Sequence, residues 1–205
     1  SSAASDVYKR QPDICVITNI GMAHLEFFKT REGIFQEKSQ MIQDMKNGGT
    51  IILNGDDDIL SSCGPIKGVT PQFFGIGKNN EFYADNITSL GLKGTSCTIH
   101  LPSGECFDCT VPLPGAHMVS NALSGAAVGY NLDLTAEEIK AGIEHLPSIP
   151  GRGAIISTDK LVILDDCYNA NPVSMKASMD VLDLAIGRKV AVLGDMGELG
   201  DDASR

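Results

Sequence analysis

The sequence lacks a long apolar run and an excess of positive charge. No stretch approaches the roughly 18 apolar residues that a membrane-spanning helix needs, so we expect no membrane span. No charged-then-apolar secretion leader is visible, which favours a cytoplasmic protein. With 16 Lys and Arg against 26 Asp and Glu, the formal net charge is −10. Nucleic-acid-binding surfaces are normally basic, so we expect no nucleic-acid partner.

Two nucleotide-binding motifs are also missing. The chain has no G-x-x-x-x-G-K-[ST] phosphate loop. Gly75-x-Gly77 begins like a dinucleotide fingerprint, but the third glycine and the following helix are absent, which argues against one. Small anionic ligands stay compatible with the acidic composition, because a few backbone N–H groups are enough to bind them.

The 6 cysteines are too few for a disulfide scaffold in a chain of 205 residues, so we expect reduced thiols. Four residues have spacings that superficially resemble a zinc site: Cys97, His100, Cys106 and Cys109. The same segment also reads as two extended runs around a Pro-Ser-Gly turn. Residues three apart on a strand face opposite sides, so each pair would be split, and the alternation disfavours zinc.

Four short apolar runs, bounded by polar or turn residues, predict buried strands of a mostly parallel sheet. They are Ile14–Ile17, Ile51–Leu53, Leu161–Leu164 and Val190–Leu193. Helical patterns lie between and after these runs, so we predict an α/β fold. From Phe82 to Val111 the pattern alternates, which indicates a small antiparallel β insert.

Composition also suggests the domain limits. Residues 1–11 (SSAASDVYKRQ) are small, polar and non-periodic, and we interpret them as a non-native leader. The segment PSIPGRG, from Pro147 to Gly153, is rich in helix and strand breakers and predicts a hinge. We therefore predict one domain over residues 12–149 and a second over residues 150–205.

Polar residues follow each of the four predicted strands. They are Thr18-Asn19, Asn54-Gly55-Asp56, Asp165-Asp166 and Gly194-Asp195. Ligands of open parallel sheets bind beyond the carboxyl ends of the strands, so these residues are candidate ligand contacts, although chains must leave a core somewhere. The pair Asp165-Asp166 is costly unless water, a cation or a ligand meets it.

The clearest helix is predicted over REGIFQEKSQMIQDMKNGG. Its apolar stripe contains Ile34, Phe35, Met41, Ile42 and Met45. Lys38 falls inside this stripe. Either its stem covers apolar surface while the ammonium reaches water, or it is buried with a lowered pKa that permits carbamylation and metal binding. His24, after the first strand, is either a structural hydrogen-bonding residue or a metal ligand.

A second helix is predicted after Pro114-Gly115, in LPGAHMVSNALSGAAVGYNL. Its apolar side contains Met118, Val119, Ala122, Leu123 and Ala126. His117 and Asn121 are four positions apart and share the other side. They are either a cap and a solvated residue, or a polar edge that suits a nucleobase.

These residues resemble the Mur ligases of peptidoglycan synthesis. The strings that carry the resemblance are TNIGMAHLEFF, EKSQMI, NGDDD, LPGAHMVSNALSGAAVG, GRG, LDDCYNANPVSMKASMDVL and VAVLGDMGELG. They extend over nearly all of residues 12–205. YNANP and LGDM-x-ELG resemble most closely the members that add D-alanyl-D-alanine to a UDP-N-acetylmuramoyl-tripeptide. Those two molecules are the partners that the resemblance implies.

The resemblance implies the later part of a mostly parallel-sheet ATP-binding central domain, followed by the start of a Rossmann-like C-terminal domain. The family's phosphate loop would precede Pro12, and further strands would follow Arg205. We therefore expect both domains to be incomplete and the chain alone to be inactive. A monomer is also expected.

The family mechanism implies roles for individual residues, with ATP and Mg²⁺ as cofactors. ATP phosphorylates a peptide carboxylate, and the incoming amine attacks the acyl phosphate; Mg²⁺ and positive groups stabilise the spread charge. His24 and a carbamylated Lys38 would bind Mg²⁺. These two residues and Arg152, which would reach the γ-phosphate, form the catalytic set.

The remaining implied contacts concern the nucleotide and the acceptor. The ATP-binding set is Asn19, Asn54, His117, Asn121, Arg152 and Asp166. Within it, Asn121 would contact adenine, and Asp166 would accept hydrogen bonds from the ribose. Asn169 and Asn171 would line the cleft where D-alanyl-D-alanine enters.

Two positions depart from the family pattern. Met118 stands where asparagine often follows the histidine, and Cys167 stands where serine is common. The first departure puts one nucleotide contact in doubt. The alternatives are a sibling Mur ligase, a folylpolyglutamate synthase-like amide ligase, or a non-catalytic nucleotide-binding relative.

Overall fold

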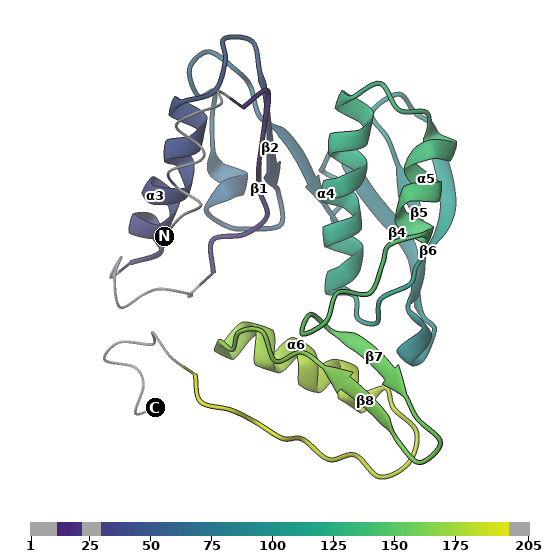
Figure 1. The fold of residues 1–205 in the computed structure, drawn as a ribbon. Helices are drawn as coiled ribbons and strands as arrows, with labels where there is room; N and C mark the ends of the chain where they lie inside the picture. Colours follow the sequence, from purple (N-terminus) through teal and green to yellow (C-terminus); the bar gives the residue numbers. More distant parts are fainter. Residues whose placement is uncertain (1–11, 22–29, 197–205) are drawn as a thin grey trace.

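The computed structural model describes residues 12–21 and 30–196 (Figure 1). The strands of its large sheet are β1 Ile14–Ile17, β2 Thr50–Asn54, β3 Gln72–Gly75, β4 Phe82–Ser89, β5 Thr95–His100 and β6 Cys106–Val111. The helices are α3 Arg31–Gln43, α4 His117–Asn131, α5 Ala136–Glu144 and α6 Pro172–Asp183, with 3-10 turns η1 Leu60–Ser62 and η2 Gly91–Lys93. A separate hairpin consists of β7 Ala154–Ser157 and β8 Val162–Asp165. No helix in these ranges is long and apolar enough to cross a bilayer.

The large sheet has six strands in the order in which they occur along the chain. β1, β2, β3 and β4 pair in parallel, whereas β4, β5 and β6 pair antiparallel. The α/β class and the antiparallel segment are therefore confirmed. The antiparallel strands continue the parallel sheet rather than forming a separate body, because β4 pairs with both β3 and β5.

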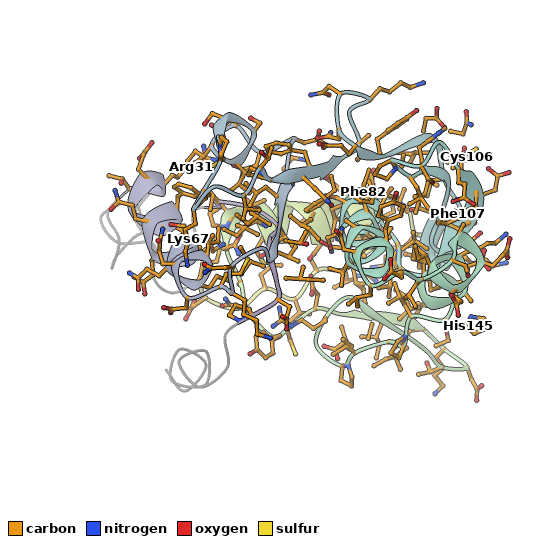
Figure 2. The ribbon with its side chains drawn as sticks, turned by 90° about the horizontal axis from the view of Figure 1, so that it is seen from above. Arg31, Lys67, Phe82, Cys106, Phe107 and His145 are labelled. Atoms are coloured by element: carbon orange, nitrogen blue, oxygen red, sulfur yellow. The ribbon has the colours of Figure 1, made fainter. Side chains whose placement is uncertain are left out.

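The parallel part of the sheet lies between two apolar clusters. Along β2, Ile51 and Leu53 point into the cluster that contains α3, while Ile52 points into the cluster that contains α4 and α5. Successive side chains of a strand alternate in direction, so a strand between two layers must be apolar throughout. Figure 2 shows the two sides, with Arg31 and Lys67 near α3 and with Phe82 and Phe107 on the side of α4 and α5.

Helix α3 forms as its pattern predicts, and side chains cap both of its ends. Thr30 is its N-cap, and its hydroxyl accepts a hydrogen bond from Gly33 N at 3.1 Å. At the other end, Lys67 Nζ donates to the carbonyls of Gln43 at 2.7 Å and Met45 at 3.2 Å. Lys67 occupies a tight turn with a φ of 51°. The predicted stripe is confirmed: Ile34, Ile42 and Met45 are buried, and Phe35 and Met41 pack against them.

Helix α4 also forms as predicted and lies across the other face of the sheet. Val119, Leu123 and Ala126 are fully buried. Its small residues allow close packing: a Cβ at Gly129 would lie 3.0 Å from Ile139 Cγ1 of α5. Helix α5 begins with a capping box between Thr135 and Glu138.

The alternation predicted for the cysteine-rich segment is confirmed. Cys97 lies opposite Cys109 across β5 and β6, and His100 lies opposite Cys106. Both members of the first pair are buried, whereas Cys106 is exposed and His100 is half-buried. The two pairs therefore lie on opposite faces of the sheet.

Two predicted strands are wrong in detail. The run Leu161–Leu164 becomes β8, which pairs antiparallel with β7 and is exposed at Val162 and Ile163. The run Val190–Leu193 has no regular secondary structure, and Val192 is 94% exposed. A strand needs a hydrogen-bonded neighbour, and within the described ranges β8 has only β7 while Val190–Leu193 has none.

The packing of α4 gives a testable stability difference. We expect Leu123→Ala, at a fully buried position, to lower the free energy of unfolding by about 2–5 kcal/mol, because it leaves a cavity between α4 and the sheet. Leu132→Ala, at a leucine that is 59% exposed just after the same helix, should change it by no more than about 0.5 kcal/mol. Urea unfolding of both variants measures the difference, and equal losses would contradict this account of the packing.

Candidate functional site

The carboxyl ends of β1 and β2 meet at one edge of the sheet, as the parallel pairing requires. Asn54 Nδ2 donates to the carbonyl of Thr18 at 2.9 Å, and Asn54 Oδ1 accepts from Asp56 N at 2.9 Å. Asn54 therefore ties the ends of both strands together. Asn19 is exposed beside this junction.

Lys38 reaches the same edge from α3. Its Nζ donates to the carbonyl of Asn19 at 2.8 Å. Lys38 is exposed overall, so its stem passes the apolar stripe while the ammonium reaches the strand ends. Partial burial of the ammonium still lowers the pKa of Lys38, and the carboxylate of Asp57 opposes this effect. Lys38, Asn19 and Asn54 are thus brought together, while His24 lies outside the described residues.

Asp57 and Arg31 hold this edge in place, and neither was predicted as a site residue from the sequence. Asp57 is 8% exposed. Its carboxylate accepts hydrogen bonds from Ile20 N at 2.7 Å, Ile59 N at 3.0 Å and Leu60 N at 3.1 Å. Arg31 Nε donates to the Ile20 carbonyl at 2.8 Å. The only signal in the sequence was the aspartate run of NGDDD, which does not say which carboxylate turns inward.

Arg31 also pairs with the next carboxylate along this run. Its Nη1 donates to Asp58 Oδ2 at 2.8 Å, and its Nη2 donates to the other oxygen of Asp58. The guanidinium lowers the pKa of Asp58. Arg31 therefore bridges the segment after β1 and the loop after β2.

Asp56 explains the incomplete glycine motif. Its carboxylate accepts hydrogen bonds from Ile76 N, from Gly77 N at 3.3 Å and from Asn80 Nδ2 at 3.0 Å. A Cβ at Gly75 would lie 2.5 Å from Asp56 Oδ1. The two glycines therefore admit a carboxylate of this chain rather than a dinucleotide phosphate.

The hinge forms a second group of candidate residues. Gly151 is buried and has a φ of 73°, a conformation that favours glycine. Its N–H donates to Asp165 Oδ2 at 2.9 Å, and its carbonyl accepts from Tyr168 N at 3.1 Å. Asp165, the last residue of β8, is therefore hydrogen-bonded to the backbone of the hinge. The Cys167 thiol and the Gly151 N–H lower the pKa of Asp165, and the same thiol contact raises the pKa of Cys167.

Arg152 follows this hinge glycine and is exposed. Its guanidinium carbon lies 3.6 Å from the centroid of the Tyr168 ring, which is a cation–π contact. Tyr168 thus contacts the hinge twice, through its backbone N–H and through its ring. Sequence reasoning did not predict this role for Tyr168.

His117 is the first residue of α4, and Asp166 directly follows β8. The hydroxyl of Ser178 on α6 donates to Asp166. Burial lowers the pKa of His117, and the carboxylates of Asp166 and Asp180 partly offset this effect. Gly115, with a φ of 105°, makes room for the imidazole: a Cβ there would lie 2.6 Å from His117 Cε1.

The asparagines have different surroundings. Asn121 is exposed, and its Nδ2 contacts Met118 Sδ at 3.4 Å. Asn169 is exposed, and its Oδ1 accepts from Ala170 N at 3.0 Å. Asn171 is the N-cap of α6, where its Oδ1 accepts from Ser174 N at 2.9 Å. Pro172 occupies the first turn of that helix, as predicted.

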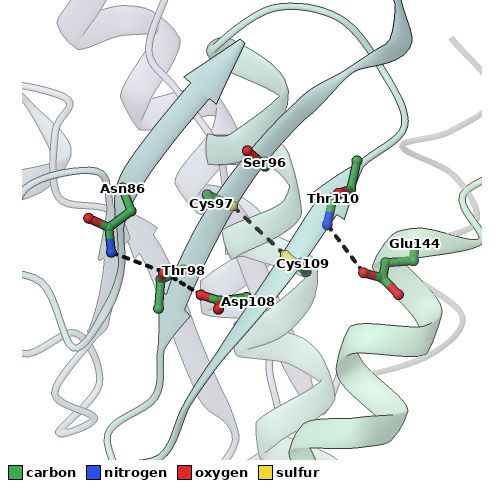
Figure 3. Close-up of a pocket in the computed structure, with 8 residues that line it drawn as sticks. All are labelled: Asn86, Ser96, Cys97, Thr98, Asp108, Cys109, Thr110 and Glu144. Carbon is green, nitrogen blue, oxygen red and sulfur yellow. Dashed lines mark hydrogen bonds between the residues drawn. The ribbon is translucent and has the colours of Figure 1, made fainter. Parts of the chain in front are cut away.

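The candidate residues therefore fall into two groups. One contains Asn19, Lys38 and Asn54 at the strand ends, and the other surrounds the hinge. Across residues 12–21 and 30–196, no recorded hydrogen bond or ion pair joins the two groups. A polar hollow of about 340 Å³ lies on β5 and β6 and shares no lining residue with either group (Figure 3).

The strand-end group yields a prediction about Asp57. We expect Asp57→Ala to lower the free energy of unfolding by about 2 kcal/mol or more, because three backbone N–H groups lose their acceptor. Asp58→Ala is the matched control; its carboxylate is 72% exposed, so we expect little change. Urea unfolding distinguishes the two, and a control variant as unstable as Asp57→Ala would refute the role of Asp57.

The hinge yields a second prediction. Removing the acceptor in Asp165→Ala frees the Gly151 N–H, so we expect faster tryptic cleavage after Arg152. Asp159→Ala, in the exposed turn between β7 and β8, serves as the control. Cleavage after Arg152 is followed by mass spectrometry. An unchanged rate in Asp165→Ala would show that this hydrogen bond does not hold the hinge.

Family models match most of the chain. The Mur ligase middle domain matches residues 1–129, and the Mur ligase, glutamate ligase domain matches residues 151–205. The first match includes the segment 1–11 that composition sets apart. The predicted boundary lies between the two matches.

Individual relatives agree with the family models. The UDP-N-acetylmuramoyl-tripeptide–D-alanyl-D-alanine ligase of Buchnera aphidicola subsp. Acyrthosiphon pisum is 36% identical over 197 residues, which is 94% of this chain and 43% of that protein. MurF from Acinetobacter baumannii has a similar structure, with a TM-score of 0.87 and 34% identity over 94% of this chain and 42% of that chain. MurF ligase from Thermotoga maritima in complex with ADP has a TM-score of 0.85 and 27% identity over 98% of this chain and 46% of that chain.

This chain thus spans less than half the length of these relatives. The similarity nevertheless includes both the six-stranded sheet with its strand-end residues and the hinge with the segment after it. The match of the first family model to residues 1–129, together with the length of chain over which the relatives are similar, shows which family this is. The chain belongs to the Mur ligase family.

Proposed function

We propose that the protein containing this chain is an ATP-dependent ligase of peptidoglycan precursor synthesis. It would add D-alanyl-D-alanine to a UDP-N-acetylmuramoyl-tripeptide through an acyl phosphate. The observation that carries the proposal is the similarity over 94% of this chain to a relative of that name. The sequence YNANP, which leads from the loop after β8 into α6, supports the choice of this acceptor among those of the family.

The nucleotide-binding part of the proposal concerns the hinge group and the strand ends. The ADP complex of the Thermotoga maritima ligase supports a nucleotide site. Arg152 is exposed and carries the positive charge that a γ-phosphate requires, and Asp166 offers a carboxylate to a ribose hydroxyl. Asn121 is exposed on α4 for adenine. His117, Asn19 and Asn54 complete the proposed nucleotide contacts.

Lys38 is the proposed metal-binding residue, together with His24. An ammonium does not bind Mg²⁺, but a carbamate offers the oxygen ligands that Mg²⁺ prefers. The surroundings of Lys38 fit this requirement, because the neighbouring Asn19 carbonyl is an oxygen ligand. The lowered pKa of Lys38 also increases the fraction of neutral amine. The neutral amine attacks carbon dioxide, a nitrogen–carbon bond forms, and a proton leaves. When bound, Mg²⁺ would stabilise negative charge on the phosphate oxygens.

The acceptor side is proposed at the loop between β8 and α6. Asn169 and Asn171 lie there, and the capping role of Asn171 fixes the start of α6 beside them. We also propose the domain limits 12–149 and 150–205, a cytoplasmic location and a monomer. The use of a soluble nucleotide and a soluble dipeptide supports the location.

Phosphate release from ATP tests the reaction in the complete protein encoded by the gene. With UDP-N-acetylmuramoyl-tripeptide, we expect release that requires D-alanyl-D-alanine and that falls by at least about 100-fold in Lys38→Ala, because a charge-stabilising group is lost. Lys46→Ala, which removes an exposed lysine paired with Asp13 at 2.7 Å, is the control. Release that ignores the dipeptide would favour a sibling ligase, and no release from the folded protein would favour a non-catalytic relative.

The carbamate has a test that does not depend on activity. In bicarbonate buffer labelled with carbon-13, we expect a carbamate NMR signal from this chain at about pH 8. Neutral amine is more abundant at Lys38 than at an ordinary lysine, because its pKa is lowered. The signal should vanish in Lys38→Ala and persist in Lys46→Ala. A signal that survives the first substitution would assign the carbamate to another amine.

A further inference from the structure

Strands β5 and β6 carry two thiols that the proposed ligase reaction does not use. Cys97 and Cys109 lie directly opposite one another in the antiparallel pairing. They are 3% and 4% exposed and belong to the apolar cluster beneath α4 and α5. Their sulfur atoms are 3.8 Å apart (Figure 3).

The backbone at this pair is compatible with a disulfide. Residues directly opposite each other on antiparallel strands have Cα atoms about 4.5–5.5 Å apart. Disulfides span Cα separations of about 4.4–6.8 Å, with sulfurs about 2.05 Å apart. The two sulfurs of Cys97 and Cys109 therefore need only a side-chain rotation to bond, and the strands can keep their register.

The two thiols are not equivalent. The hydrogen bond between the two sulfurs, in which either thiol can be the donor, lowers the pKa of Cys97 and raises the pKa of Cys109. Thiolate is the reactive form of cysteine. The proposed reaction begins at Cys97, and Cys109, whose sulfur lies 3.8 Å away, is placed to resolve the product.

An oxidant has a route to this pair at the edge of the sheet. Among the strands of the described ranges, β6 is the last of the sheet and pairs with β5 alone. Beyond it, Glu144 of α5 accepts from Thr110 N at 3.2 Å. The polar hollow of about 340 Å³ lies over the same two strands (Figure 3). Local opening of an edge strand requires less free energy than global unfolding, so a small molecule can reach the sulfurs while the rest of the chain stays folded.

We propose that Cys97 and Cys109 are a redox-active pair that hydrogen peroxide oxidises to an intramolecular disulfide and that a dithiol reductant restores. The Cys97 thiolate attacks one peroxide oxygen, the oxygen–oxygen bond breaks, and the departing hydroxide takes a proton to become water. The sulfenic acid on Cys97 is then attacked by the Cys109 sulfur. Hydroxide leaves and takes the Cys109 proton as a second water. Two thiols are oxidised by two electrons, and one peroxide is reduced to two waters.

The disulfide would tie the edge strand to its neighbour. The two residues are 12 positions apart, so the bond closes a short loop in the unfolded chain. The loss of unfolded-state entropy should raise the Tm by roughly 5–10 °C. This change is independent of nucleotide and of the proposed ligase reaction.

Thiol counting after peroxide treatment tests the proposal on this chain. The reduced chain has 6 cysteines and should take six maleimide labels after denaturation. After peroxide and removal of excess oxidant, four labels are expected, and dithiothreitol should restore six. Peptide mapping without reduction should show a linkage between Cys97 and Cys109, and the oxidised chain should melt at the higher Tm.

Matched variants identify the pair. In Cys97→Ser and in Cys109→Ser, peroxide should no longer remove two thiols. In Cys106→Ser, at an exposed cysteine of β6, peroxide should still remove two thiols. Mapping of the unsubstituted chain remains decisive if a serine variant fails to fold. A linkage between other cysteines, or six labels after peroxide that fully oxidises a reference dithiol peptide, would overturn the proposal.

Discussion

The burial of β2 on both faces is the constraint from which the rest of the structure follows. Ile51, Ile52 and Leu53 have no exposed surface, and they point alternately into two separate clusters. A strand in this position must have a neighbour on each side, and it pairs in parallel with β1 and β3. Parallel pairing then places the carboxyl ends of three strands at one edge. The chemistry proposed for Lys38 and Asn54 lies at this edge.

Carboxylates bound to backbone N–H groups organise both groups of candidate residues. Asp57 holds the segment after β1, Asp56 holds the loop after β3, and Asp165 holds the hinge at Gly151. An ionised carboxylate makes strong hydrogen bonds with backbone donors, so each of these loops has a fixed path. The aspartates that follow the strands thus act first on the protein itself. Asp166, whose recorded donor is the Ser178 hydroxyl, is the member of the hinge pair proposed to meet a ligand.

Periodicity predicted those parts of the fold in which a regular backbone sets the direction of each successive side chain. The stripes of α3 and α4, the strands β1 and β2 and the opposite faces of Cys97 and His100 are all of this kind. The run Leu161–Leu164 was predicted as a buried parallel strand and Val190–Leu193 as another, yet an apolar run does not specify its neighbours. The same limit applies to the site. The resemblance implied roles for Lys38 and Arg152, but the inward turn of Asp57 and the stacking of Tyr168 on Arg152 depend on tertiary contacts.

The turn at Lys67 sets two preferences against each other. Its backbone is left-handed, with a φ of 51°, and Gly68 follows with a φ of 77°. Glycine or asparagine would suit that backbone better than lysine does. Only a long cationic side chain, however, reaches the carbonyls of Gln43 and Met45 at the end of α3. Local conformational preference and a distant helix end therefore compete for one position, and a designer who optimised the turn alone would remove the residue that completes the helix.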